Sequence, residues 1–105
     1  MLEEFINLKI SKPIITALNE MGFEEPTPIQ REAIPIALSG RDMIGQAQTG
    51  TGKTAAFGIP MLERVPAKGE GPFALVLAPT RELAIQSAEE INRLAQHLPH
   101  WALPI

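Results

Sequence analysis

Residues 47–54 are the part of the chain whose residue types most clearly indicate chemistry. In order, they are Ala47, Gln48, Thr49, Gly50, Thr51, Gly52, Lys53 and Thr54. This is the pattern of a phosphate-binding loop, with alanine where the first glycine often stands. Gly50 and Gly52 let backbone N–H groups turn inward around a phosphate without a Cβ clash. We therefore expect a phosphate site, the simpler alternative being a glycine-rich turn with an exposed lysine.

The last two residues of this loop would add a charge and a metal ligand. Lys53 supplies a positive charge that can reach the β- and γ-phosphates of a nucleotide, and the Thr54 hydroxyl can ligate Mg²⁺. A helix that begins near Lys53 would point the positive end of its dipole at the same anion. We therefore expect Lys53 and Thr54 to be the catalytic residues of this segment.

A second candidate site is the segment 22–30, which reads GFEEPTPIQ. Thr27 and Gln30 have the spacing of a capping box, with Pro28 at the first position of a helix. The Gln30 amide also places a donor beside an acceptor, which complements the N6 and N7 edge of adenine but not guanine. Upstream, Phe5 either anchors the N-terminus, which is the simpler alternative, or stacks on a base.

Thr80 and Arg81 form a third candidate site, within the sequence PTRELA at residues 79–84. They follow a predicted strand and precede a predicted helix, at the edge of the sheet where α/β proteins bind ligands. A hydroxyl, a guanidinium and free N–H groups can hold a backbone phosphate there. The simpler alternative is a capped helix with a surface arginine.

Prolines, glycines and apolar spacing predict the elements that would position these residues. The predicted helices occupy residues 12–21, 28–39, 53–62 and 82–97. Ser11 is expected to cap the first helix with its hydroxyl, Pro35 to bend the second, and the third to break near Pro60. Strands are expected at 42–44 and 73–78, and the order of elements predicts a parallel α/β layer.

The predicted sheet is too small to stand alone. Parallel sheets need both faces covered, and two confident strands do not make a stable one. The tail from Trp101 to Ile105 has the composition of the beginning of a further strand. We therefore expect the chain to be part of a larger domain.

Length and composition exclude several other classes of protein. The 105 residues, of which 45% are hydrophobic and 20% charged, are typical of at most one globular domain. No apolar run approaches the roughly 18 residues of a membrane span, and the acidic N-terminus is unlike a signal peptide. The chain has no cysteine and a net charge of −3 without a basic patch. We expect a cytoplasmic protein without a membrane anchor.

Together, the three segments resemble the amino-terminal part of a DEAD-box ATP-dependent RNA helicase. GFEEPTPIQ is similar to the family's Q motif, AQTGTGKT to its motif I and PTRELA to its motif Ia, and Phe5 to its upstream aromatic. The resemblance implies an α/β P-loop NTPase, here an incomplete first RecA-like domain with parallel strands covered by helices. It divides the chain into an N-terminal helical Q-motif segment, 1–40, and the first half of the ATP-binding domain, 41–105.

The resemblance also implies a function and a role for each site. The parent protein would bind ATP with Mg²⁺ and couple its hydrolysis to the unwinding of RNA duplexes, with single-stranded or short duplex RNA as partner. Phe5 would stack on adenine, and Gln30 would read the edge of the base. Residues 47–54 would hold the phosphates and Mg²⁺, and Thr80 with Arg81 would bind the RNA backbone.

Several parts of the family pattern have no counterpart in these residues: the Asp-Glu-Ala-Asp motif, the Ser-Ala-Thr motif and the second RecA-like domain. We therefore expect this chain alone to carry ATP-binding and part of the RNA-binding residues but no useful hydrolysis or unwinding. Expressed alone, it is expected to aggregate or to be molten, because a strand edge is uncovered. Two alternatives stay open: a weak adenine-nucleotide-binding fragment without activity, and another P-loop NTPase.

Overall fold

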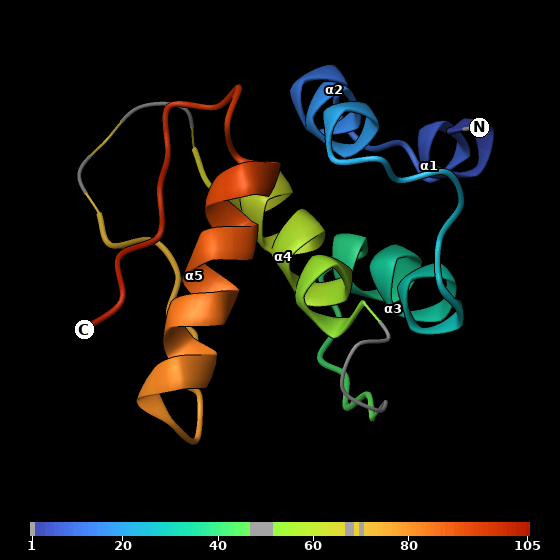
Figure 1. Cartoon of the computed structure of the whole chain (residues 1–105). Coiled ribbons are helices and arrows are strands. Elements are labelled where there is room, and N and C mark those ends of the chain that lie inside the picture. Colours follow the sequence, from blue (N-terminus) through green and yellow to red (C-terminus); the bar gives the residue numbers. More distant parts are fainter. Residues whose placement is uncertain (1, 47–51, 67–68, 70) are drawn as a thin grey trace.

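A computed structural model describes residues 2–46, 52–66, 69 and 71–105, and in this part of the chain the regular elements are helices (Figure 1). They are α1 (Glu3–Asn7), α2 (Lys12–Glu20), α3 (Pro28–Leu38), α4 (Lys53–Arg64) and α5 (Arg81–Leu94). Helix α4 lies in the middle, with α3 packed on one side and α5 on the other, and α2 also contacts α5. None of these helices has the length and hydrophobicity needed to cross a membrane.

Helices α2 to α5 begin and end close to the predicted positions, with two corrections, whereas the short helix α1 is not among the predicted helices. Ser11 is the N-cap residue of α2, but its hydroxyl does not cap the helix. Instead, the Ser11 Oγ donates to Oε1 of Glu63 at 2.5 Å, and the Ser11 N–H donates to the same oxygen at 3.3 Å. A carboxylate at the end of α4 is a stronger acceptor than a neutral group, so Ser11 ties α2 to α4.

The second correction concerns Pro60, near which the sequence predicts a break. Helix α4 continues through Pro60 to Arg64. An internal proline costs a helix about 3 kcal/mol, but Ile59 and Leu62 on either side of it are buried in the core. Burying a large aliphatic side chain contributes about 1.5–3 kcal/mol, so packing offsets the lost hydrogen bond.

One buried cluster joins all five helices and therefore links the segments on either side of residue 40. Its members are Phe5, Ile10, Ile14, Leu18, Ile34, Ala55, Ile59, Leu62, Ile91, Leu94 and Ala95. Helix α3 thus packs directly on α4, the helix that follows the predicted phosphate loop. Leu83, in the first turn of α5, lies outside this cluster and is 39% exposed.

The expected strands are not formed within the described residues. Segments 42–44 and 73–78 have no regular structure, and their apolar side chains lie on the surface, with Ile44 95%, Leu75 80% and Leu77 86% exposed. A strand exists only through a ladder of hydrogen bonds to a neighbour, and the two segments do not supply one to each other. The parallel layer is therefore not confirmed by this structure.

The C-terminal tail is held beside α5 by a single side chain. The Asn92 Nδ2 donates to the carbonyl of Ala102 at 3.1 Å, and the Ala102 N–H donates to Oδ1 of Asn92 at 2.6 Å. The amide of Asn92 thus satisfies both backbone groups of one residue, as a neighbouring strand would. Trp101 and Leu103 on either side remain 77% and 75% exposed.

Candidate functional site

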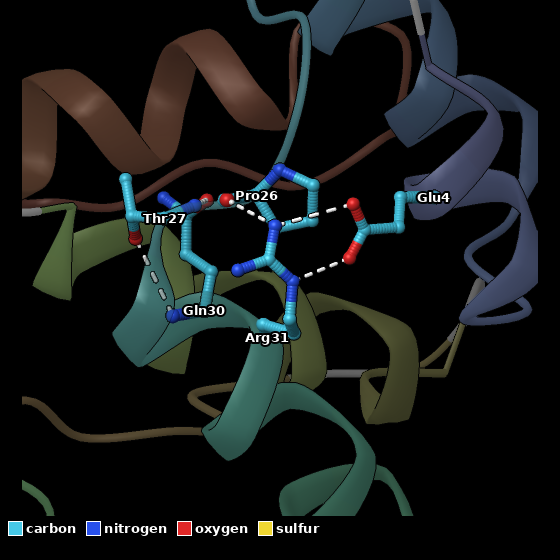
Figure 2. Close-up of polar contacts among 5 residues, drawn as sticks. All are labelled: Glu4, Pro26, Thr27, Gln30 and Arg31. Atoms are coloured by element: carbon cyan, nitrogen blue, oxygen red, sulfur yellow. Dashed lines mark hydrogen bonds and ion pairs between the residues drawn. The ribbon is translucent and has the colours of Figure 1, made fainter.

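The N-terminus of α3 forms the capping box that its sequence predicts. Thr27 Oγ1 accepts a hydrogen bond from the Gln30 N–H at 3.4 Å, and Gln30 Oε1 accepts one from the Thr27 N–H at 3.0 Å (Figure 2). Pro28 occupies the first turn, where its missing N–H costs nothing. The capping interpretation of Thr27 and Gln30 is therefore confirmed.

The Gln30 amide also reaches the end of the predicted phosphate loop. Its Nε2 donates to the carbonyl of Gly52 at 3.2 Å, across 22 residues of sequence, and its side chain is only 1% exposed. A primary amide has two N–H groups and two oxygen lone pairs. Within the described residues, these contacts leave one N–H and one lone pair of Gln30 for a further partner.

Gly52 is the residue that permits this close approach. It is the N-cap of α4 and has a left-handed backbone with φ of +85°. A Cβ at this position would collide with Nε2 of Gln30 and lie 3.0 Å from Oγ1 of Thr27. Glycine is thus required here twice, for the backbone conformation and for the space that Gln30 and Thr27 occupy.

The first turn of α4 presents Lys53, which is exposed, and Thr54, which is half-buried. No acidic side chain lies in this turn, so the positive end of the helix dipole is not neutralised from within the turn. Lys53 also lines a groove between α3 and α4, with Ile29 and Ala33. The other predicted phosphate-loop residues, Ala47, Gln48, Thr49, Gly50 and Thr51, lie outside the described residues.

The structure places Phe5 in the core. Its ring is fully buried and packs edge to face on Phe23, with the ring centroids 6.0 Å apart and an angle of 67° between the planes. The resemblance implies that Phe5 stacks on adenine, but in this structure no face of its ring is exposed. The position fits the alternative interpretation, in which Phe5 anchors the N-terminal segment.

Thr80 and Arg81 lie together at the N-terminus of α5, as predicted, far along the chain from the other motifs. Thr80 Oγ1 accepts a hydrogen bond from the Leu83 N–H at 3.2 Å, so Thr80 caps the helix. Arg81 is exposed and lines a second, smaller hollow with Ile85 and Ile105. The structure thus shows the capped helix of the simpler interpretation, and both Thr80 and Arg81 are exposed to solvent.

One cluster escapes sequence reasoning altogether. The Arg31 Nε donates to Oε2 of Glu4 at 2.5 Å, and its Nη2 donates at 3.2 Å both to Oε1 of Glu4 and to the carbonyl of Pro26 (Figure 2). The hydrogen bond from Arg31 lowers the pKa of Glu4, and Glu4 in turn raises the pKa of Arg31. The partners lie 27 residues apart, so no local spacing reveals them.

Comparisons with known proteins agree with the three motifs. Residues 27–103 match the family model described as DEAD/DEAH box helicase. The chain is 52% identical over 101 residues to the DEAD-box ATP-dependent RNA helicase CshA of Bacillus subtilis, covering 96% of this chain and 20% of that protein. It is 54% identical to CshA of Bacillus cereus, again covering 96% of this chain and 19% of the relative.

Solved structures give the same result at the level of the fold. The ADP-bound RNA helicase Prp28 of Chaetomium thermophilum matches with a TM-score of 0.83 and 45% identity, over 91% of this chain and 24% of that one. Dbp5 of S. cerevisiae, bound to RNA and ADP BeF3, matches with a TM-score of 0.85 and 40% identity, over 89% and 24%.

These matches define both the fold and the extent of the chain. Its fold is that of the corresponding part of a P-loop NTPase. The chain spans about a fifth of the length of the curated relatives and about a quarter of the solved chains. Because the family model covers well over half of its residues, the chain belongs to the DEAD/DEAH box helicase family.

Proposed function

We propose that this segment is the adenine-nucleotide-binding part of an ATP-dependent RNA helicase and that it also carries part of the RNA-binding surface. Its relatives from Bacillus are named as ATP-dependent RNA helicases, and the similar Dbp5 structure holds RNA and ADP BeF3. The observation that carries the proposal is the hydrogen bond from Gln30 to the carbonyl of Gly52. It joins the glutamine of one motif to the end of the phosphate loop, as a single nucleotide site requires.

The phosphates of ATP would lie at the N-terminus of α4. The uncapped amides of the first turn donate to anions, and Lys53 adds a positive charge directly beside them. The Thr54 hydroxyl is a hard oxygen donor of the kind that Mg²⁺ accepts alongside phosphate oxygens and water. When bound, Mg²⁺ would neutralise charge on the phosphates during phosphoryl transfer. Residues 47–51 would complete the loop.

Gln30 would select the base once a nucleotide opens the site around this side chain, which is only 1% exposed in the structure. The N–H and the lone pair that its present contacts leave unused complement N7 and the N6 amino group of adenine. Guanine, which has acceptors at both positions, would leave the lone pair of Gln30 unsatisfied. Phe5 would contribute from the core by holding α1 against the rest of the site.

The RNA contact would lie at the N-terminus of α5, where the Arg81 guanidinium and the Thr80 hydroxyl can bind one backbone phosphate. In the complete domain, we expect segments 42–44 and 73–78 to form parallel strands, because neighbours would satisfy their backbone groups and cover their apolar side chains. The division into a Q-motif segment, 1–40, and the first half of a RecA-like domain, 41–105, belongs to this proposal. A cytoplasmic location stays a prediction.

The proposal is tested by titrating the full-length protein with a fluorescent ATP analogue. Replacing Lys53 by alanine should weaken binding by roughly 10–100-fold, since a hydrogen bond to a charged group contributes about 1.5–3 kcal/mol. Lys12 is the matched control, because it is also an exposed lysine at the first position of a helix. Lys12→Ala should leave the affinity unchanged. Equal affinities for Lys53→Ala and the unmodified protein would show that α4 does not bind the phosphates.

A further inference from the structure

The peptide group between Pro26 and Thr27 is held at both of its ends (Figure 2). Its carbonyl, on Pro26, accepts a hydrogen bond from Nη2 of Arg31 at 3.2 Å. Its N–H, on Thr27, donates to Oε1 of Gln30 at 3.0 Å. Because a peptide group is a rigid plane, a side chain that fixes the carbonyl also fixes the direction of the N–H, and with it the Gln30 amide.

Arg31 is itself oriented by Glu4 of α1. Two guanidinium nitrogens contact the two carboxylate oxygens, at 2.5 Å and 3.2 Å, which is the two-pronged geometry that arginine forms and lysine does not. One of those nitrogens, Nη2, is the same atom that binds Pro26. The Glu4 carboxylate thus orients Nη2 of Arg31, the atom that binds the Pro26 carbonyl.

The chain of contacts ends in the nucleotide site. It runs from Glu4 through Arg31 and the peptide group to Gln30, and the other end of the Gln30 amide donates to the carbonyl of Gly52 at 3.2 Å. Gln30 is buried, whereas Glu4 and Arg31 are 44% and 46% exposed. The exposed pair therefore lies outside the site and acts on it only through the peptide group.

We propose that Arg31, aimed by Glu4, is a positioning residue that sets the orientation of the Gln30 amide and thereby the affinity and base preference of the nucleotide site. This inference rests on the proposed function. Exposed ion pairs contribute little to stability, so the effect of Arg31 is on nucleotide binding and not on folding.

The test compares three variants of the full-length protein with fluorescent analogues of ATP and of GTP. Arg31→Met removes both contacts of the guanidinium, Arg31→Lys keeps the charge without the two-pronged geometry, and Glu4→Gln removes only the charge of the partner. Glu20→Gln is the matched control. It removes the charge of Glu20 in the His97–Glu20 pair, whose side chains are 39% and 49% exposed and which joins α2 to the residues after α5.

We expect Arg31→Met to weaken ATP binding by about 2- to 30-fold, the range seen for coupling through packed contacts. The affinity for GTP should change less, so the ratio of ATP affinity to GTP affinity becomes smaller. Arg31→Lys and Glu4→Gln should fall between Arg31→Met and the unmodified protein, and Glu20→Gln should behave like the unmodified protein. The melting temperature of each variant is measured alongside, because a purely structural role would lower both affinities together with the melting temperature.

An unchanged ratio of ATP to GTP affinity in Arg31→Met would overturn the inference, as would an equal effect of Glu20→Gln. Lys53→Ala, measured in the same series, separates this failure from failure of the proposed function. If Lys53→Ala weakens binding and Arg31→Met does not alter the ratio, the positioning role is wrong and the nucleotide site stands. If Lys53→Ala has no effect, the nucleotide site itself is wrong.

Discussion

The N-termini of α4 and α5 each lie within a candidate motif, but they are built differently. Helix α4 begins with Gly52, which has a left-handed backbone and no side chain with which to cap the helix. Helix α5 begins with Thr80, which has an extended backbone and whose hydroxyl accepts from the Leu83 N–H. The first turn of α5 also contains the acidic Glu82, whereas that of α4 contains no acidic residue.

This difference indicates how many phosphate groups each helix N-terminus can bind. The amides at the start of α4 have no capping side chain, and Lys53 adds charge, so this end suits several phosphate groups at once. At α5, Thr80 already satisfies one amide and Glu82 offsets part of the dipole. That end suits a single phosphate, bound chiefly by Arg81. The contrast supports the proposal of a nucleotide at α4 and an RNA backbone at α5.

The largest effect is expected from adding a side chain at Gly52, the N-cap residue that distinguishes α4 from α5. Gly52→Ala should destabilise the protein by about 2–5 kcal/mol, because a left-handed alanine costs about 1–2 kcal/mol and overpacking about 1–3 kcal/mol. Gly22→Ala is the matched control, with the same φ of +85° but no atom within 4 Å of the added Cβ. It should show only the backbone cost. Equal losses in denaturant unfolding would mean that Gln30 and Thr27 do not crowd Gly52.

Replacing Arg81 tests the α5 terminus. Arg81→Ala should weaken binding of single-stranded RNA by roughly 10–100-fold, from about 1.5–3 kcal/mol for one charge-assisted contact, and leave ATP affinity unchanged. Arg93, exposed in the last turn of the same helix, provides the control. If Arg81→Ala and Arg93→Ala lower the RNA affinity equally, the effect is one of general charge and α5 carries no RNA site.

Thr80 is expected to have a smaller, structural effect. Thr80→Ala should lower the free energy of unfolding by about 0.5–2 kcal/mol through loss of the cap, and Thr80→Ser, which keeps a hydroxyl, should recover most of it. Thermal melts of both variants check this. A loss of stability in Thr80→Ser as large as in Thr80→Ala would contradict the capping role, since serine supplies the same acceptor.

The smallest expected effect is on the stability of the protein at low pH, through Glu4. Arg31 holds the pKa of Glu4 below its usual value of 4.5, so the folded protein gains stability from ionised Glu4 above about pH 4.5. That gain is lost as the pH falls through the lowered pKa. Stability measured between pH 7 and pH 3 should therefore fall slightly less steeply in Glu4→Gln. Superimposable pH profiles would show that the Glu4–Arg31 pair does not form in solution.

Helices α2 to α5 could be predicted because their signals are local, whereas α1, which has no side-chain cap, could not. Ser11 and Thr27 precede α2 and α3 directly, Gly22 and Gly40 follow them with left-handed backbones, and each helix satisfies its own backbone hydrogen bonds. The capping box of Thr27 and Gln30 is equally local. The same signals place Lys53, Thr80 and Arg81 at helix N-termini.

The remaining features depend on partners far along the chain. A strand at 73–78 needs a neighbour for its backbone, and composition alone does not say whether one is present. The Ser11 hydroxyl binds Glu63 across 52 residues, and Arg31 binds Glu4 across 27 residues. Phe5 illustrates the same limit, because its type fits both stacking and burial and only the packing on Phe23 distinguishes them.

Amide hydrogen exchange of the full-length protein tests the central claim most directly, because it observes both helix N-termini in one measurement. Mg-ATP should slow exchange of the Lys53, Thr54 and Ala55 amides and leave those of Arg81 and Glu82 unaffected. Single-stranded RNA added without nucleotide should slow exchange at Arg81 and Glu82 and not at Lys53. Slowing by ATP at both termini alike, or at neither, would contradict the assignment of the nucleotide to α4.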